Sequence, residues 1–193
     1  MDLVLGAAEK FNLPEHLRNF TKGDSTKICS CDISEVNDFN ASFSVTDRTR
    51  TFLKVQDGCD YNCSFCTIPL ARGKSRSNSL ENVVQQAREI GAKGVKEIVL
   101  TGVNLGDFGM LDGERKNSFF ELCQALDTVE EVSRYRISSI EPNLLTKEII
   151  ALVAASKKFM PHFHIPLQSG SDTILGLMRR RYKRELYAER IEM

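Results

Sequence analysis

The sequence predicts an α/β fold, a partial (βα) barrel of the TIM type with about four βα units. Three observations support this fold. Apolar strand-like runs alternate with helical patterns from Arg50 onward. The predicted strands carry one apolar and one polar face. Each strand is followed by a loop rich in cysteine, glycine, serine or glutamate. Since sites in βα barrels lie at the carboxyl ends of strands, these loops are expected to surround one pocket.

The first unit begins with a strand over Thr51–Gln56, "TFLKVQ", which leads directly into a cysteine loop. Apolar residues then recur at helical spacing, namely Leu80, Val83, Val84, Ala87 and Ile90. Asn78 or Ser79 is expected to cap this helix, and Gly91 to end it.

The later units repeat this order. Strands are predicted over Glu97–Gly102, Arg134–Ile140 and His162–Gln168, and helices over Phe119–Leu126, Leu145–Ala155 and Thr173 to the end. Repeated βα units favour parallel strands joined by right-handed helical crossovers.

The faces of the strands favour a barrel over a doubly wound sheet. In the first strand, Leu53 and Val55 oppose Lys54 and Gln56, and the third and fourth strands alternate similarly. A doubly wound sheet buries both faces and would be apolar throughout. A partial barrel with a ligand-filled interior explains the polar face, and a sheet with one solvent-exposed face is the alternative.

Residues 1–49 differ in character and are expected to be the end of an N-terminal domain plus a linker. "MDLVLGAAEKF" predicts a strand entering a helix, whereas residues 22–40 are polar and predict irregular structure. Residues 50–193 form the predicted core domain. The abrupt ends and the small number of units suggest an excerpt from a longer protein.

Composition restricts the possible function classes. The 193 residues have zero formal net charge, so no global basic field points to nucleic acid, although a local patch would suffice. We find neither an apolar run long enough for a membrane span nor a secretory signal. The six cysteines are bunched rather than spread as a disulfide framework would be. A reducing, cytoplasmic compartment is expected.

The stretch "GCDYNCSFC" brings Cys59, Cys63 and Cys66 together on one loop. Thiolates at this spacing predict a metal site. A structural zinc site needs a fourth ligand, for which Cys29, Cys31, His162 and His164 are the candidates. An iron–sulfur cluster can instead be held by three cysteines and keep one iron open for catalysis.

The motif resembles that of the radical S-adenosylmethionine (radical SAM) enzymes, with aromatic Phe65 before the last cysteine. The wider string "FLKVQDGCDYNCSFCTIPLARGKSRS" resembles the methylthiotransferases of that group. "LTGVNLGDFG", "RISSIEP" and "HIPLQSGSDTILGLMRRRY" look most like the branch that modifies N6-threonylcarbamoyladenosine beside the tRNA anticodon. Related branches act on isopentenyladenosine of tRNA or on an aspartate of a ribosomal protein.

The resemblance implies a [4Fe-4S] cluster on Cys59, Cys63 and Cys66, with SAM on the open iron and a 5′-deoxyadenosyl radical from its reductive cleavage. It further implies the tRNA anticodon stem-loop as partner, and a reductant such as flavodoxin or ferredoxin. The family's second [4Fe-4S] cluster is expected only in a full-length protein. Its cysteines are not matched here, because Cys29 and Cys31 stand at other positions.

Further candidates lie at the strand ends. Besides Phe65, the residues expected to contact SAM are Gly102, Asn104, Ser139, Glu141 and Gln168, each with an ordinary loop role as the alternative. Two basic runs, Arg72/Lys74/Arg76 and Arg179–Arg181, predict either tRNA phosphate contacts or solvated surface. The rival from another class is a zinc-stabilised, non-catalytic nucleic-acid binding module.

Overall fold

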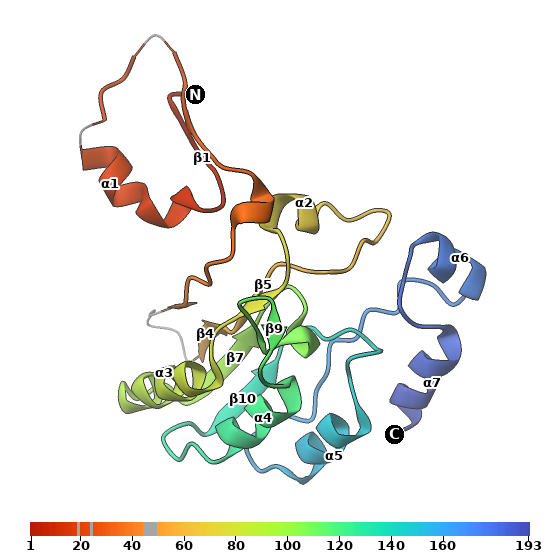
Figure 1. Ribbon diagram of the computed structural model, residues 1–193. Coiled ribbons are helices and arrows are strands. Elements are labelled where there is room, and N and C mark those ends of the chain that lie inside the picture. The colour runs from red at the N-terminus through yellow and green to blue at the C-terminus, as the bar shows by residue number, and fades with distance from the viewer. Residues whose placement is uncertain (19, 24, 45–49) are drawn as a thin grey trace.

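The centre of the computed structural model, which describes residues 1–18, 20–23, 25–44 and 50–193, is a four-stranded sheet with strand order β10–β7–β4–β3 (Figure 1). Strands β4 (Arg50–Lys54), β7 (Glu97–Thr101) and β10 (Arg134–Ile137) run parallel to one another. Strand β3 (Ser42–Phe43) pairs antiparallel with β4. The parallel core that the sequence predicts is confirmed for three strands.

Three helices follow these strands and lie side by side over one face of the sheet (Figure 1). They are α3 (Leu80–Ala92), α4 (Phe119–Asp127) and α5 (Lys147–Ala155). The Ser79 hydroxyl caps α3 by accepting from the backbone N–H of Asn82, as one of the two expected caps. Gly91 lies inside α3 rather than ending it. A Cβ there would meet Glu131 at 2.6 Å, so this glycine permits close packing.

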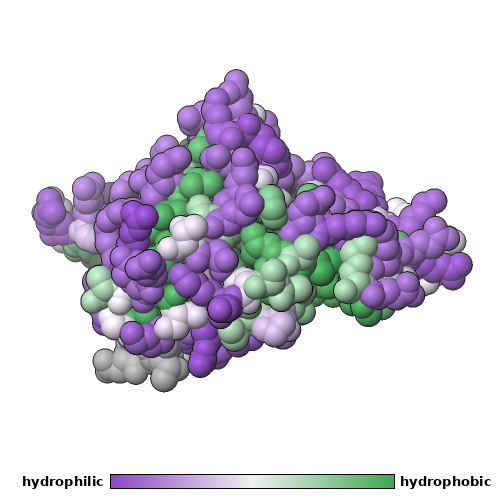
Figure 2. Space-filling view, turned by 90° about the horizontal axis from the view of Figure 1, so that it is seen from below, coloured by the Kyte–Doolittle hydropathy of each residue, from purple (hydrophilic) through white to green (hydrophobic). Residues whose placement is uncertain are grey.

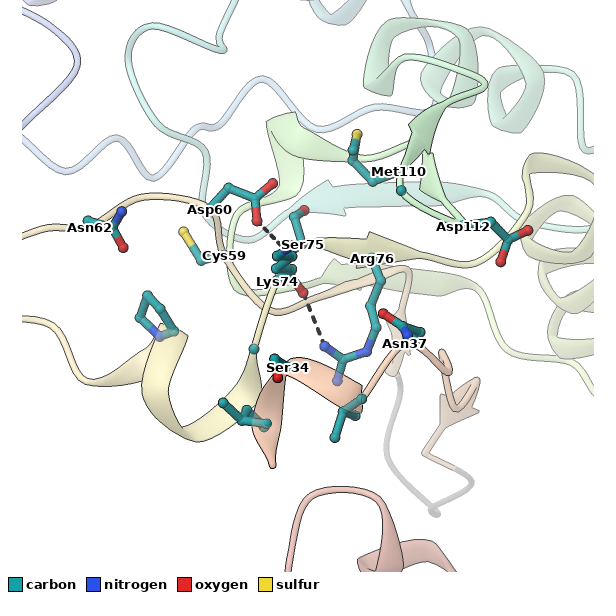
Figure 3. A pocket seen from close by; sticks show the side chains of 15 residues that line it. Ser34, Asn37, Cys59, Asp60, Asn62, Lys74, Ser75, Arg76, Met110 and Asp112 are labelled. Atoms are coloured by element: carbon teal, nitrogen blue, oxygen red, sulfur yellow. Dashed lines mark hydrogen bonds between the residues drawn. The ribbon is translucent and has the colours of Figure 1, made fainter. Parts of the chain in front are cut away.

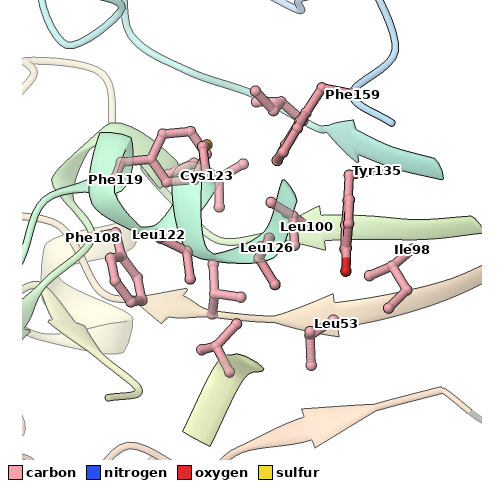
Figure 4. Packing of buried hydrophobic residues seen from close by; sticks show 14 of the residues in the cluster. Leu53, Ile98, Leu100, Phe108, Phe119, Leu122, Cys123, Leu126, Tyr135 and Phe159 are labelled. Carbon is pink, nitrogen blue, oxygen red and sulfur yellow. The ribbon is translucent and has the colours of Figure 1, made fainter. Parts of the chain in front are cut away.

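The hydrophobic core fills the space between these helices and the sheet (Figure 4). Leu53, Leu100 and Tyr135 project from the three parallel strands and are fully buried. The Tyr135 ring stacks on Phe159 with ring centroids 5.2 Å apart. On the underside of the molecule, hydrophilic residues predominate and hydrophobic residues form smaller patches among them (Figure 2).

The opposite face of the sheet is largely polar, as the alternation of β4 and β10 predicts. Glu97 forms ion pairs with Arg136 at 3.4 Å and with Arg134 at 3.9 Å. Lys54 lies on the same face as Glu97, because successive side chains of a strand point to opposite faces of the sheet. Strand β7 departs from this pattern, because its apolar residue Val99 lies on the polar face and is buried, with 5% exposure.

The predicted fourth strand, His162–Gln168, is not formed. This segment leaves β10 after a short parallel contact between Tyr135 and Phe159. Farther along, the N–H of Ile140 donates to the His164 carbonyl at 3.1 Å. Pro166 has no N–H to donate, which prevents a regular ladder there. The central sheet therefore contains three parallel strands, and the strands of the described residues form no closed barrel.

The predicted C-terminal helix is divided into α6 (Asp172–Leu177) and α7 (Arg184–Glu192). Arg179 has a φ of 57°, and this left-handed conformation ends the first helix. The turn between the helices carries Arg180 and Arg181, whose side chains point toward the cysteine loop.

The N-terminal segment contains β1 (Leu3–Leu5), the 3₁₀ turn Glu9–Asn12 and α1 (Leu13–Arg18), so the strand and helix predicted there are confirmed. The prediction of irregular structure for residues 22–40 is wrong at β2 (Lys27–Cys29), which pairs parallel with β1. Gly6 permits this pairing, since a Cβ would meet Ser30 Cβ at 2.9 Å. The expected domain boundary falls at residues 45–49, outside the described residues.

Short elements surround the cysteine loop. These are the 3₁₀ turns Ile33–Glu35 and Leu105–Asp107, helix α2 (Ile68–Arg72), and the antiparallel pairs β5 (Gln56–Asp57) with β6 (Arg76–Ser77) and β8 (Met110–Leu111) with β9 (Glu114–Arg115). None of the described helices has the length and apolar character needed to cross a membrane.

Candidate metal centre

The cysteine loop runs from β5 to α2 and turns sharply at its start. Gly58 has a φ of 71°, and a Cβ on it would lie 1.9 Å from the Lys74 carbonyl oxygen. Cys59 follows immediately, and its N–H donates to the Gly73 carbonyl at 3.1 Å. The first cysteine is therefore held by backbone contacts to the segment before β6.

The three cysteines share one cavity of about 110 Å³. Its walls come from the cysteine loop, the loop after β7, the loop after β10, the segment before α6 and the turn after α6. The lining residues are Cys59, Tyr61, Cys63, Phe65, Cys66, Ile68, Val103, Asn104, Glu141, Gln168 and Arg180. The structure thus brings together Cys59, Cys63, Cys66, Phe65, Asn104, Glu141 and Gln168.

Two of the residues expected to contact SAM lie elsewhere. Gly102 borders a different hollow, beside Gln56 and Arg72. Ser139 is partly buried in the loop after β10 and does not line the cavity. Among the candidate zinc donors, Cys31 is exposed on the N-terminal side, and neither histidine candidate lines the cavity.

The cysteines are not arranged around a single ion. Within the described ranges, no group of three or more His, Cys, Asp or Glu side chains converges closely enough to hold one metal ion. A structural zinc site needs four donors at about 2.0–2.3 Å from one centre. The cysteine loop supplies three sulfur donors, Cys59, Cys63 and Cys66.

The Cys59 thiol is protonated at neutral pH in this arrangement. Burial raises its pKa to about 11, assisted by the nearby Asp107 carboxylate and the other two cysteines. The Tyr61 N–H, 3.4 Å from the Cys59 sulfur, opposes the shift. Since the thiolate is the metal ligand, an iron centre bound here would have to displace this proton.

Arg180 is the cavity residue whose role the sequence did not reveal. Its side chain is 4% exposed, it donates to the Cys63 sulfur at 3.2 Å, and it forms an ion pair with Glu141. Burial alone would lower the pKa of Arg180, but the hydrogen bond and charge of Glu141 outweigh it and raise the pKa. The guanidinium therefore keeps its charge next to the cysteine loop. Its Nε has no partner among the described residues.

The other members of the two basic runs have different environments. Arg181 lies over the Tyr61 ring at 4.0 Å from its centroid and donates to the Asp60 carbonyl at 2.9 Å. Arg72 and Arg76 both contact Asp57, at 3.0 and 3.5 Å. These three arginines therefore already make contacts within the chain.

Asp57 is the centre of a buried charge network beneath the cysteine loop. It is 2% exposed and contacts Lys54, Arg72 and Arg76. Burial would raise the pKa of this carboxyl, but the hydrogen bonds from Arg72 and from the Gly58 N–H, together with the charges of Arg76 and Lys54, hold it below its usual value. The ionised carboxylate anchors both ends of the loop.

The outer side of the cysteine loop borders a second hollow of about 580 Å³ (Figure 3). The Asp60 carboxylate accepts from the Ser75 N–H at 3.0 Å, and Arg76 donates to the Lys74 carbonyl at 3.1 Å. The first bond holds the cysteine loop against residues 74–76, and the second is internal to that segment. Lys74, from the first basic run, lines this hollow.

Asn104 carries the feature that points most clearly to a ligand. It is 3% exposed, it lines the cysteine cavity, and neither atom of its amide has a hydrogen-bond partner within the described chain. Leaving a buried polar group unpaired costs about 1–3 kcal/mol. A polar ligand in the cavity would remove that cost.

Comparison with known proteins identifies the family. The sequence pattern of the Radical SAM superfamily matches residues 53–193, which include the cysteine loop, strands β7 and β10 and the helices that cover the sheet. This chain belongs to the radical SAM superfamily. The resemblance seen in the cysteine motif is confirmed.

Individual relatives of this radical SAM chain are methylthiotransferases. It is 48% identical over 147 residues to the threonylcarbamoyladenosine tRNA methylthiotransferase MtaB of Bacillus subtilis, covering 76% of the chain and 32% of the relative. It is 33% identical to the tRNA-2-methylthio-N(6)-dimethylallyladenosine synthase of Orientia tsutsugamushi, covering 100% of the chain and 43% of the relative. The chain thus spans less than half the length of these relatives.

A solved structure supports the fold. The radical SAM methyltransferase TsrM of Kitasatospora setae superposes with a TM-score of 0.59 at 16% identity, covering 73% of this chain and 27% of TsrM. At this identity, the likeness shows a shared radical SAM fold and nothing of the substrate. The predicted α/β class is therefore confirmed, whereas the described strands form an open sheet and the partial barrel stays a prediction.

Proposed function

We propose that this chain is the catalytic core of a radical SAM methylthiotransferase. In this proposal, Cys59, Cys63 and Cys66 ligate a [4Fe-4S] cluster, and SAM binds beside it in the same cavity. The observation that carries the proposal is the shared cavity, in which three thiols face the unpaired amide of Asn104. Cysteine thiolates are the usual ligands of such clusters.

The residues present fit the cofactors chemically. The Asn104 amide can accept from the amino group or donate to the carboxylate of an amino-acid ligand, and the unpaired Nε of Arg180 can donate to the carboxylate. The Phe65 ring lies in the cavity wall and offers a flat apolar surface. When bound, the reduced cluster would supply the electron that cleaves SAM to a radical.

The chain's own residues then hold and shield the reactants. Glu141 keeps the charged Arg180 guanidinium oriented toward the cavity, where it donates to Cys63. Gln168 and Tyr61 complete the wall. Residues that exclude water protect a radical from side reactions, which is the protein's main task in such chemistry.

For the substrate, we propose N6-threonylcarbamoyladenosine beside the tRNA anticodon. Relatives named for this substrate share 48% identity over 147 residues and 38% over 192 residues with the chain, compared with 33% over 195 residues for the relative named for dimethylallyladenosine. The proposal includes a second cluster elsewhere in a full-length protein, a flavodoxin or ferredoxin as reductant, and a cytoplasmic location. We also propose the division into residues 1–49 and 50–193.

Mass spectrometry of tRNA nucleosides tests the substrate. Cells lacking the full-length gene should lose 2-methylthio-N6-threonylcarbamoyladenosine, and the unthiolated nucleoside should accumulate. The wild-type gene should restore it, whereas a Cys63→Ala gene should not. Unchanged methylthio-adenosines in the deletion strain, with loss of methylthiolation on a ribosomal protein, would contradict the tRNA proposal.

A further inference from the structure

Gln56 is a buried amide at the base of the cysteine loop, next to the cavity but outside its lining. It is 1% exposed. Its Nε2 lies 3.0 Å from the Asp57 carbonyl, 2.8 Å from the Gly58 carbonyl and 3.0 Å from the Ser75 hydroxyl. Its Oε1 accepts from the N–H groups of Val103 and Asn104 at 2.9 and 2.8 Å.

The chemistry of these partners fixes the orientation of the amide. Backbone N–H groups only donate and carbonyl oxygens only accept. A flipped amide would therefore place its NH₂ against two N–H donors and its oxygen against two carbonyls. The donor end must face the cysteine loop, and the acceptor end must face the loop after β7.

Gln56 occupies the point where the sheet opens. The ladder between β4 and β7 continues to the bond from the Val55 N–H to the Thr101 carbonyl, at 2.9 Å. Beyond it, Gln56 and Asp57 pair with β6 instead of β7. The Gln56 amide spans the gap that this divergence creates. Gly102 permits the close approach, since a Cβ there would lie 2.9 Å from Gln56 Oε1.

The two loops joined by this amide carry the two parts of the candidate site. Gly58 precedes Cys59, the first of the three cysteines. Asn104 carries the unpaired amide that lines the same cavity. A shift of either loop would therefore change the separation between the cysteines and the polar groups opposite them.

We propose that Gln56 is a positioning residue that fixes the Asn104 loop against the cysteine loop, and thereby sets how SAM in the cavity meets the cluster. This inference rests on the proposed function. Gln56 acts through its neighbours and does not line the cysteine cavity. A residue that positions the site in this way affects the affinity and orientation of SAM more than the assembly of the cluster on the three cysteines.

The test uses Gln56→Glu in the whole chain, reconstituted anaerobically with iron and sulfide. The carboxylate keeps the acceptor for Val103 and Asn104 but has no hydrogens for the carbonyls of Asp57 and Gly58. We expect unchanged iron content and about tenfold weaker SAM binding by equilibrium dialysis, equivalent to about 1.4 kcal/mol. We also expect a smaller SAM-induced change in the electron paramagnetic resonance spectrum of the reduced cluster.

A matched control is Gln124→Glu, the same chemical change on the exposed side of α4. It should bind SAM as the wild type does. Gln56→Met is the second variant, since it keeps the length of the side chain without burying a charge. It should also weaken SAM binding, because it no longer joins the two loops.

The outcomes separate this inference from the proposed function. If wild-type protein assembles no cluster or binds no SAM, the proposed function fails, and this inference fails with it. If wild-type protein binds SAM and a folded Gln56 variant binds it equally well, only the positioning role is rejected. The role is also rejected if both variants lack a native circular dichroism spectrum, because Gln56 is then a folding determinant.

Discussion

Different interactions stabilise the helix-covered face of the sheet and the loops at the carboxyl ends of its strands. Between the sheet and helices α3, α4 and α5, the buried side chains are nearly all apolar. At the carboxyl ends of the strands, the buried groups include Gln56, Asp57, Arg76 and Asn104. The first region depends on the burial of apolar area, which has no directional requirement. The second depends on hydrogen bonds and ion pairs with defined partners.

Because of this difference, substitutions in the two regions should differ in how they affect the stability of the domain and the geometry of the site. An apolar core tolerates changes that conserve volume, and its defects lower the stability of the whole domain. A buried polar network tolerates little, because each lost partner leaves another group unsatisfied. Substitutions in the helix-covered core should therefore reduce the free energy of unfolding without affecting metal content per folded chain. Substitution of Asp57, whose ion pairs anchor the cysteine loop, should affect both.

The largest effect on stability is expected in the core, at Phe159. Its ring is 1% exposed and stacks on Tyr135. Phe159→Ala should lower the free energy of unfolding by about 4 kcal/mol in urea titrations, because it removes buried area and leaves a cavity. Iron per folded chain should stay at the wild-type value.

Phe52→Ala is the matched control, because Phe52 is 40% exposed on the other face of the sheet. It should cost clearly less than Phe159→Ala. An equal loss for the two variants would show that the helix-covered face is not the main hydrophobic core.

A somewhat smaller loss of stability, accompanied by a loss of iron content, is expected when Asp57 is replaced. Asp57→Asn removes the charge that pairs with Lys54, Arg72 and Arg76. We expect a loss of about 3 kcal/mol in unfolding free energy, since Arg76 and Lys54, which are largely buried, lose their partner. Iron content after reconstitution should also fall, because the network anchors the cysteine loop.

Asp112→Asn makes the same change at an exposed position. It should alter the unfolding free energy by less than about 0.5 kcal/mol. Full iron content in the Asp57→Asn variant, despite lower stability, would contradict the distinction between the two regions.

The smallest effect is expected at the surface ion pair between Glu114 and Lys116. Both side chains are mostly exposed, at 71% and 51%. Glu114→Gln should change the unfolding free energy by less than about 0.5 kcal/mol. A loss comparable with that of Asp57→Asn would mean that burial does not decide the strength of ion pairs here.

The apolar side of the molecule could be predicted well from the sequence. Helix α3 and strands β4, β7 and β10 follow from hydrophobic periodicity, because their apolar faces are buried against each other. Residues 162–168 show the same alternation, yet they form no strand. Their alternation reflects packing of Phe163 and Ile165 against the core, while Pro166 interrupts the ladder.

The polar side could be predicted only in part. The cysteines were evident because their spacing is local, and Asn104, Glu141 and Gln168 because they end strand-like segments. In the sequence, Gln56 belongs to the polar face of a predicted strand and Arg180 to a basic run. Three of the five partners of Gln56 lie 19–48 residues away in sequence, and the two partners of Arg180 lie 39 and 117 residues away, so no local pattern reveals them.

Strand β2 has no local sequence signal for a related reason. It is short, largely exposed, and formed only through its pairing with β1, more than 20 residues earlier. Tertiary pairing of this kind overrides local composition.

The central claim is that Cys59, Cys63 and Cys66 together hold an iron–sulfur cluster, and metal analysis after anaerobic reconstitution tests it most directly. Wild-type protein should contain about four iron and four sulfide per chain. The variant with all three cysteines replaced by alanine should contain almost none, whereas Cys31→Ala should match the wild type. Stoichiometric zinc without iron or sulfide in wild-type protein, or full iron in the triple variant, would contradict the claim.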